Sequence, residues 1–478
     1  MTTPGLSETL TRNGLVESFH QQFTSKKTLE VPNIHLTNKP FQFATIDNFL
    51  ADKSSIPKLV DEMEAMDWTR KQMDLYEFYQ TTDLANVKSS NLAQFYDFLN
   101  NEVRTWMQLL TGMKFKRISA SCSMYNCGDF LLTHDDLLSD RLIAFVFYLS
   151  PWKGTKKWHE NMGGALELFK TDEDGHPRFP SASAILPANN QFVFFKVEKK
   201  SYHQVAEVLN KDYPRLTING WFHGYQDNLD FDADAVKFSN PTVTAFKRPN
   251  EGTTDQLSAF INKTYLKDSI KFSIQKQIEE NSEAALGEFL KVDLQATIFK
   301  KLQNTKLKWI TRGPSNQQNY ECLDLTSLPS SSILRSLLDM VSSKAMFKLL
   351  HEYTELDLHG DQAKKPKCSI EIQRWKGGNY TLIGDPSTYD EDTLDLIFYF
   401  GNNDNVGVIT YLTPEEDSAE SSSSENEDEP VLLTIYPQNN FLNIVYRSKG
   451  TAKFTKYCSK STVMSTEFNY ILFCSYKE

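Results

Sequence analysis

The stretch from residue 117 to 224 constrains the fold most, because it consists of short apolar segments separated by turns. Segments of this length, rich in aromatic and β-branched residues, are typical of β-strands. No helical period intervenes between them, which favours an antiparallel barrel or jelly roll. The expected strands lie at residues 119–126, 130–134, 142–149, 165–169, 192–197, 202–205 and 216–222.

Two helical segments precede these strands. Apolar side chains in residues 91–110 recur at the spacing of one helix face, and Ser90 or Asn91 can cap the backbone amides at its start. Residues 54–68 also read as a helix. We interpret the apolar stripe as core packing rather than as a ligand site. The predicted fold class is therefore α+β, with helices that buttress a sheet.

A weak internal repeat indicates a second copy of the same fold. Residues 125–132 match residues 375–382, and residues 187–190 match residues 437–440, at the same offset of 250 positions. Two separated segments that share one offset are typical of a duplicated domain. We expect a first domain over residues 1–235, a linker over 236–256, and a second domain over 257–478 that carries an acidic insert at 414–430. The insert is rich in serine and glutamate, which predicts disorder.

Charge and cysteine usage narrow the functional classes. The net charge of −11 disfavours binding to a phosphate backbone over a broad surface. The longest apolar run near the middle of the chain, residues 142–149, is too short to span a bilayer, and residues 1–13 lack the apolar core of a secretory signal. The 6 cysteines include no Cys-x-x-Cys pair, which is typical of thiols in a reducing compartment. We therefore expect an intracellular protein, cytosolic or nuclear.

One pair of polar residues in the strand-rich stretch predicts a metal site. His134 and Asp136 stand two positions apart after an apolar approach, and on a β-strand such residues point to the same face. An imidazole and a carboxylate, joined by a second imidazole, form the ligand set of non-haem iron sites that keep positions open for a co-substrate and oxygen. The similar pair His359 and Asp361 lies in a polar stretch with no histidine after it, and we interpret it as a chance match.

The second imidazole must come from a later histidine. His203 follows an apolar strand, whereas His159 and His176 lie in polar loops, and His223 at a strand end is the rival candidate. Arg215, which lies 12 residues after His203 at the start of an apolar strand, favours His203, because a cation at such a position needs an explanation. A guanidinium there can clamp a ligand carboxylate with two hydrogen bonds, and the alternative is a structural salt bridge.

The second copy does not repeat this chemistry. At the common offset His134 falls on Gly384, Asp136 on Pro386 and His203 on Lys453. Glycine and proline cannot ligate a metal through a side chain. We therefore expect a metal-free second copy that serves binding, support or regulation.

Taken together, these residues resemble a known enzyme family. The spacing His134-x-Asp136, His203, Arg215 resembles the Fe(II)/2-oxoglutarate oxygenases, and the surrounding residues are similar to those of the ribosomal prolyl hydroxylases. The matching positions are Tyr125-Asn126, Gly128-Asp129, Leu132, His134-Asp135-Asp136, Arg141, Tyr148, Gly163-Gly164, Phe194-Phe195, His203-Gln204-Val205 and Gly220-Trp221-Phe222-His223-Gly224. The resemblance covers residues from about 40 to 225 strongly, and the C-terminal half in layout.

The resemblance implies two tandem double-stranded β-helix domains, of which the second is catalytically silent. It also implies Fe(II), 2-oxoglutarate, O2 and L-ascorbate as cofactors and co-substrates. Iron would be bound by His134, Asp136 and His203, and 2-oxoglutarate by Arg215, Tyr125 and Tyr148. For the two tyrosines the alternative is a role as core aromatics.

The resemblance further implies a substrate and a location. The family 3-hydroxylates a proline in the decoding-centre protein of the small ribosomal subunit, in nucleus and cytoplasm, which affects translation and its termination accuracy. Two alternatives stay open at this point. One is the same chemistry on a nucleic acid or small molecule, and the other is a non-catalytic interaction protein with a relict iron site.

Overall fold

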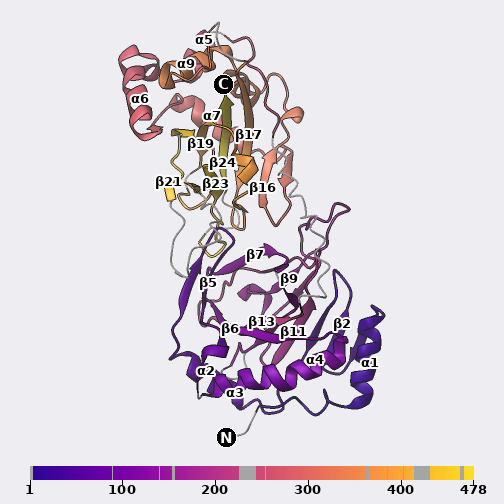
Figure 1. Cartoon of the computed structure of the whole chain (residues 1–478). Coiled ribbons are helices and arrows are strands. Elements are labelled where there is room, and N and C mark those ends of the chain that lie inside the picture. The colour runs from indigo at the N-terminus through magenta and orange to yellow at the C-terminus, as the bar shows by residue number, and fades with distance from the viewer. Residues whose placement is uncertain are drawn as a thin grey trace. The chain divides into compact units, whose positions relative to one another are not determined.

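The computed structural model describes residues 4–88, 90–138, 140–152, 157–225, 244–252, 254–360, 365–384, 386–401, 403–413, 431–462 and 468–478. The chain divides into two compact units (Figure 1). The first comprises Met1–Lys237 with Pro314–Asn316, and the second comprises Phe238–Gly313 with Gln317–Glu478. Both units combine helices with antiparallel sheets, which confirms the predicted α+β class.

An antiparallel sheet of 13 strands forms the body of the first unit. Its strands run in the order β1-β2-β3-β11-β8-β13-β6-β5-β7-β12-β9-β10, and β4 pairs with β5. The strands are β1 (Leu29–Val31), β2 (Ile34–Thr37), β3 (Phe43–Ile46), β4 (Thr69–Gln72), β5 (Tyr76–Gln80), β6 (Arg117–Tyr125), β7 (Phe130–His134), β8 (Arg141–Tyr148), β9 (Leu166–Leu168), β10 (Ser183–Ile185), β11 (Gln191–Lys196), β12 (His203–Val205) and β13 (Arg215–His223). All the strands expected from the sequence are present, whereas β1 to β5 and β10 were not expected.

Helices cover one face of this sheet. They are α1 (Asn13–Thr24), α2 (Ser55–Met63), α3 (Asn91–Phe98) and α4 (Arg104–Thr111), and a π-helical turn (Leu99–Val103) joins α3 to α4. Figure 1 shows α2, α3 and α4 along the same side of the sheet. The Ser90 hydroxyl accepts a hydrogen bond from the Ala93 amide at 3.1 Å, as expected for the N-cap of α3.

The opposite face of the sheet lines the interior of the first unit. In β8, Phe145 and Phe147 pack into the helix-covered core, whereas Ala144 and Tyr148 pack into a second cluster on the other side. This division follows from the strand geometry, since successive side chains point to opposite faces. The same alternation turns Arg215 and every second residue after it in β13 toward the interior.

The second unit repeats part of this strand order. Its larger sheet runs β14-β22-β19-β24-β17-β16-β15, and a three-stranded sheet runs β21-β20-β23. The order β22-β19-β24-β17 corresponds to β11-β8-β13-β6 of the first unit. The strands are β14 (Glu283–Leu286), β15 (Trp309–Arg312), β16 (Gln318–Leu323), β17 (Lys367–Trp375), β18 (Tyr380–Thr381), β19 (Thr393–Phe400), β20 (Ile409–Leu412), β21 (Val431–Ile435), β22 (Leu442–Arg447), β23 (Ala452–Thr455) and β24 (Asn469–Lys477).

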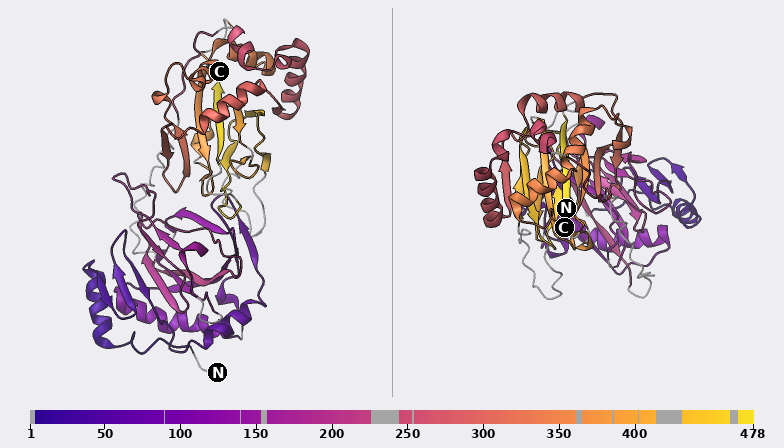
Figure 2. Two further views of the ribbon diagram at one scale, coloured as in Figure 1. Left: turned by 180° about the vertical axis from the view of Figure 1, so that it is seen from behind. Right: turned by 90° about the horizontal axis from the view of Figure 1, so that it is seen from above.

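The helices of the second unit are α5 (Thr254–Phe260), α6 (Asp268–Asn281), α7 (Val292–Leu302), α8 (Ile333–Val341) and α9 (Lys344–Thr354). Figures 1 and 2 show α6, α7 and α9 beside the sheet that contains β17, β19 and β24. Their apolar residues share one core with residues of these strands. None of the helices in the described part of the chain combines the length and apolar character needed to cross a bilayer.

The sequence of this half has a helical period over residues 256–302 and strand-like segments that resume at residue 370, and the structure differs from both patterns in detail. The stretch 256–302, which has a helical period, is interrupted by β14, because Glu283–Leu286 pairs with β22 despite the low strand propensity of its alanines. Strands also begin before residue 370, at β15. The pairing partners of both strands are distant in sequence, and a local pattern does not reveal them.

Part of the predicted linker and the whole of the predicted insert lie outside the described residues. These parts are residues 236–243 and 253 of the linker and residues 414–430. The later part of the predicted linker is hydrogen-bonded within the second unit, since the amide of Lys247 donates to the Cys368 carbonyl at 2.8 Å.

Candidate metal and co-substrate centre

Two of the three predicted metal ligands face each other across a pair of strands. His134 is the last residue of β7 and His203 is the first residue of β12. These strands are antiparallel neighbours, and His203 is the direct partner of His134. The centres of the two imidazole rings are 4.2 Å apart. The sheet therefore brings together two side chains that are 69 positions apart in the chain.

Asp136 joins them by a different route from the one expected. The prediction placed His134 and Asp136 on one face of a strand, but β7 ends at His134 and Asp136 has a left-handed backbone with φ of +61°. The Leu138 amide donates to the Asp136 carbonyl at 2.7 Å and closes the turn. A non-glycine residue in this region carries strain that is typical of functional sites. The turn, rather than strand periodicity, directs the carboxylate toward the imidazoles.

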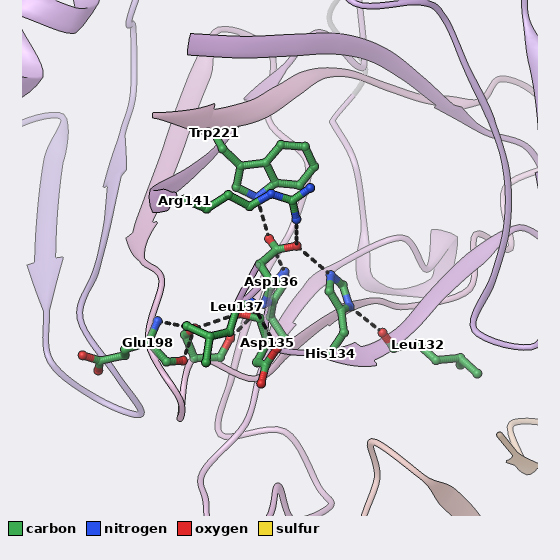
Figure 3. A network of polar contacts seen from close by, with 10 residues as sticks. Leu132, His134, Asp135, Asp136, Leu137, Arg141, Glu198 and Trp221 are labelled. Atoms are coloured by element: carbon green, nitrogen blue, oxygen red, sulfur yellow. Dashed lines mark hydrogen bonds and ion pairs between the residues drawn. The ribbon is translucent and has the colours of Figure 1, made fainter. Parts of the chain in front are cut away.

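The geometry of the three groups fits a single cation. Asp136 oxygens lie 3.6 Å from His134 Nε2 and 3.4 Å from His203 Nε2. In each ring Nδ1 faces a backbone carbonyl, that of Leu132 at 2.8 Å and that of Ser201 at 2.9 Å. Because a carbonyl oxygen only accepts, Nδ1 carries the proton and Nε2 presents its lone pair to the centre. Figure 3 shows this arrangement for His134 and Asp136.

The charges of the centre are also suited to a metal. Burial would raise the pKa of the Asp136 carboxyl, but the adjacent His203 and His134, together with the hydrogen bond donated by Trp221, hold it well below its usual value. Burial, together with the neighbouring His203, lowers the pKa of His134 to about 4. At neutral pH a carboxylate and a neutral His134 imidazole are therefore available, and these are the protonation states that bind metals. In the described part of the chain no other group of three such side chains converges in this way.

Two further side chains hold the Asp136 carboxylate. The indole of Trp221 donates to Oδ2 at 3.0 Å, and Arg141 Nη1 lies 3.5 Å from Oδ1. The Arg141 guanidinium also stacks over the Trp221 ring, 3.6 Å from its centre. Figure 3 shows both residues on the side of Asp136 that faces away from Leu132. Each carboxylate oxygen thus has its own hydrogen-bond donor.

Known protein families and individual known proteins are similar to this chain. Residues 120–223 match the model of the 2OG-Fe(II) oxygenase superfamily, and residues 252–477 match that of the oxoglutarate and iron-dependent oxygenase degradation C-terminal domain. The chain is 45% identical to the prolyl 3-hydroxylase sudestada1 of Drosophila melanogaster, over 92% of this chain and 83% of that protein. It is 31% identical to the prolyl 3-hydroxylase OGFOD1 of Xenopus laevis, over 89% of this chain and 84% of that protein.

The chain belongs to the prolyl 3-hydroxylase family of 2-oxoglutarate- and Fe(II)-dependent oxygenases. Its first unit carries the oxygenase domain, whose fold is the double-stranded β-helix, and the enzyme is a dioxygenase. The family uses Fe(II), 2-oxoglutarate and O2. The converging His134, Asp136 and His203 fit the iron of this family.

The surroundings of Arg215 fit the co-substrate of the prolyl 3-hydroxylase family. The side chain is 1% exposed, and its Nε has no hydrogen-bond partner. Among the described residues no carboxylate lies within 4.0 Å of its guanidinium, so the alternative of a structural salt bridge finds no partner there. A buried cation without a counter-charge is costly. The dicarboxylate 2-oxoglutarate would supply the missing anion.

The two predicted tyrosines flank this guanidinium. In the sheet Tyr125 is the direct partner of Arg215, and Tyr148 is the partner of Thr217 on the other side. Arg215 Nη2 donates to the Tyr148 hydroxyl at 3.4 Å, and the guanidinium lies 5.0 Å from the Tyr125 ring centre. Burial raises the pKa of both phenols. Both stay protonated at neutral pH and can donate to a carboxylate.

The three other histidines considered as metal ligands lie outside the centre. His223 lies at the opposite end of β13 from Arg215, and both its ring nitrogens are occupied, by Asp140 at 2.6 Å and by Ser119 at 2.7 Å. His159 is exposed. The His176 amide donates to Asp172 within a turn. None of the three side chains belongs to the converging group.

The contacts of Arg141 and Trp221 were not predicted, although both residues belong to the quoted resemblance. One signal was available. Arg141 opens the apolar strand β8 just as Arg215 opens β13. Trp221 stands an even number of positions after Arg215, and therefore faces the same interior.

Proposed function

We propose that this chain is an Fe(II)- and 2-oxoglutarate-dependent prolyl 3-hydroxylase. Iron is held by His134, Asp136 and His203, and the far carboxylate of 2-oxoglutarate by Arg215. The observation that carries the proposal is the convergence of the three ligand atoms, all within 4.8 Å of one another. The family membership of the chain agrees with it.

When bound, iron and 2-oxoglutarate supply the oxidation, in which one atom of O2 enters a C–H bond of the substrate and the other enters succinate as CO2 is released. The chain supplies binding and orientation. The backbone carbonyls of Leu132 and Ser201 hold the imidazoles in the ligating tautomer. Arg215 fixes the co-substrate by its far end, and Tyr125 and Tyr148 are placed to donate hydrogen bonds to it.

Aromatic rings pack against the residues of the centre and limit the access of water to it. The ring of Phe195 lies 4.5 Å from that of His203, and Tyr125 stacks on Phe78 at 4.7 Å with an angle of 10° between the rings. His203 and Arg215 are both buried. A dry site strengthens the interaction of Arg215 with a carboxylate, since less solvent screens the charges.

The proposed substrate is a proline of the decoding-centre protein of the small ribosomal subunit, and the proposed location is nucleus and cytoplasm. The support is the family resemblance of the sequence, together with relatives that are named prolyl 3-hydroxylases. Hydroxylation there would affect translation and the accuracy of its termination. L-Ascorbate would keep the iron ferrous between turnovers.

The second unit is proposed to be a catalytically silent double-stranded β-helix over residues 257–478. Its recurring strand order supports this, as do Gly384 and Lys453 at the positions that correspond to two metal ligands. Support or binding of a partner is its proposed role.

Mass spectrometry of the ribosomal protein tests the function directly. The protein is incubated with this enzyme, Fe(II), 2-oxoglutarate and ascorbate, and the expected gain is ~16 mass units on one proline, the mass of one oxygen atom. The Asp136→Ala variant is the control and gives no gain. A wild-type enzyme that consumes 2-oxoglutarate without modifying this protein acts on another substrate, such as a nucleic acid or small molecule. A wild-type enzyme that does neither is an interaction protein with a relict site.

A further inference from the structure

The ligand Asp136 is held more tightly than metal binding alone requires. Its backbone is left-handed, and the turn that contains it is closed by the Leu138 amide. Beyond the turn, the indole of Trp221 reaches Oδ2 at 3.0 Å and the guanidinium of Arg141 reaches Oδ1 at 3.5 Å. A ligand carboxylate with a fixed backbone and two fixed donors has little freedom to rotate.

The two donors form one assembly. The Arg141 guanidinium stacks on the Trp221 ring at 3.6 Å, which is close enough for a cation–π interaction. The side chain of Asp136 is 10% exposed and that of Arg141 is 21% exposed, so the contact is largely shielded from solvent. Such shielding strengthens hydrogen bonds to a charged group. Movement of either donor would therefore disturb the other.

The same two strands carry this assembly and the co-substrate residues. Arg141 begins β8, which ends with Tyr148, and Trp221 lies in β13, which begins with Arg215. The strands are hydrogen-bonded neighbours over most of their length. The sheet thus fixes the orientation of Asp136 relative to the place of the co-substrate.

The need for open coordination positions on the metal explains why the orientation of Asp136 matters. A site of two histidines and one carboxylate must leave positions for both the co-substrate and oxygen. A carboxylate that binds with both oxygens occupies one of them. A hydrogen-bond donor aimed at one carboxylate oxygen competes with the metal for that oxygen, and the Trp221 indole, 3.0 Å from Oδ2, is closer than Arg141, 3.5 Å from Oδ1.

We propose that Arg141 and Trp221 are positioning residues that restrict Asp136 to binding iron through one oxygen. The Trp221 N–H occupies Oδ2, and the stacked Arg141 holds the indole in place and balances part of the carboxylate charge. The assembly thereby keeps a coordination position free for 2-oxoglutarate. This inference rests on the proposed function.

The Trp221→Phe variant tests the inference in the full-length protein. It keeps an aromatic ring under Arg141 and removes only the indole donor. Two dissociation constants are measured without oxygen: that of Fe(II), and that of 2-oxoglutarate for the iron-loaded protein, the latter from the visible charge-transfer absorption of the complex. We expect 2-oxoglutarate binding to weaken about tenfold. Fe(II) binding should weaken far less than 2-oxoglutarate binding, since the freed oxygen can itself bind the metal.

Matched variants separate this role from a general loss of structure. Trp68→Phe removes an indole donor whose partner is the Met63 carbonyl, at 2.9 Å, and it should change neither constant. Arg141→Lys keeps the charge and loses the planar stack, and it should weaken 2-oxoglutarate binding in the same direction by a smaller factor. It also serves if Trp221→Phe does not fold.

Each remaining outcome is decisive. Equal weakening of Fe(II) and 2-oxoglutarate binding would show that the donors only stabilise the ligand, and unchanged constants would show that they only pack; either result overturns the inference. Failure of the proposed function is seen separately. In that case the wild-type protein develops no absorption with Fe(II) and 2-oxoglutarate, or Asp136→Ala develops it equally.

Discussion

The two units differ in the groups that face a buried carboxylate. The position of His203 in the first unit, which lies beside Asp136, corresponds to Lys453 in the second unit, which lies beside Asp395. In the second unit Asp395 is 0% exposed and its Oδ2 lies 3.0 Å from Lys453 Nζ. Arg447 Nε is 3.8 Å from the same oxygen. Burial would raise the pKa of Asp395, but these positive charges hold it below its usual value. In the second unit the counter-charge of the buried carboxylate is a lysine side chain. In the first unit Asp136 faces two imidazoles, and the three side chains could together hold a metal ion.

The place proposed for the co-substrate shows the same contrast. In the first unit Arg215 is the direct strand partner of Tyr125, and in the second Asn469 is the direct partner of Trp375. The aromatic stacks behind them are alike, with Tyr320 on Trp375 at 4.9 Å and 8° between the rings. The Asn469 amide donates to the carbonyls of Asn403 and Val406, whereas Arg215 Nε has no partner. The strand pairing and the aromatic stack recur in both units, whereas Arg215, with its unpartnered Nε, corresponds to an asparagine whose side-chain amide is hydrogen-bonded within the protein.

The largest expected effect is that of Asp136→Ala. It removes the one charged ligand, so the protein should lose Fe(II) binding and all 2-oxoglutarate turnover. Succinate production and iron content after desalting measure the two losses. Asp135→Asn is the matched control, because it changes the neighbouring carboxylate while its side-chain oxygen can still accept from the Leu137 amide. Full turnover in Asp136→Ala would show that Asp136 is not needed for catalysis, and would contradict the proposal that only the first unit binds iron.

Arg215→Gln should have the next largest effect. Loss of a charged hydrogen-bonding partner for the co-substrate costs about 2 kcal/mol, which raises the KM for 2-oxoglutarate about 30-fold. The kcat at saturating co-substrate should change far less, since the iron ligands are intact. Asn469→Ala in the second unit is the control and should leave this KM unchanged. A KM that rises equally in both variants would contradict the proposed role of Arg215.

Lys453→Met should destabilise the second unit without affecting iron. It leaves Asp395 buried with only the more distant Arg447 as counter-charge, at a cost of about 3 kcal/mol in the free energy of unfolding. Denaturant unfolding measures this loss, and iron titration checks that the first unit is unchanged. Lys456→Met, at an exposed position nearby, is the control. The double variant Lys453→Met/Asp395→Asn should recover much of the stability, and no recovery would show that the ion pair is not its source.

The sequence predicted the strands that carry the site better than the geometry of the site itself. Strand β7 was predicted residue for residue, because its apolar residues 130–132 follow a turn that contains Gly128 and Asp129. The left-handed turn at Asp136 was not predicted, since it depends on contacts with residues distant in the chain. The short strand β1 was missed for a related reason, because its sequence Leu29–Val31 contains a charged residue and only pairing with β2 identifies it.

The same limit applies to function. A local motif identified His134 and Asp136, and a cation in an apolar strand identified Arg215. The partnership of Trp221 with Asp136 spans 85 positions. It requires the register of β13 against β8, which no pattern in one strand contains. The residues proposed to bind the metal were therefore predictable from the sequence, whereas the residues that contact Asp136 from distant strands were not.

The smallest expected effect is that of Gly384→His, which restores one imidazole to the second unit. Its iron content should not rise, because position 386 is a proline and the Lys453 amine is paired with Asp395. The new side chain would also be crowded, since a Cβ at Gly384 lies 3.0 Å from Thr388 Oγ1 and 3.1 Å from the Tyr389 hydroxyl. The measurement is best made in the Asp136→Ala background, where any bound iron reports on the second unit. Iron bound there in stoichiometric amount would contradict this expectation. It would mean that the second unit needs only one added imidazole to bind a metal and that the Lys453–Asp395 ion pair does not prevent this.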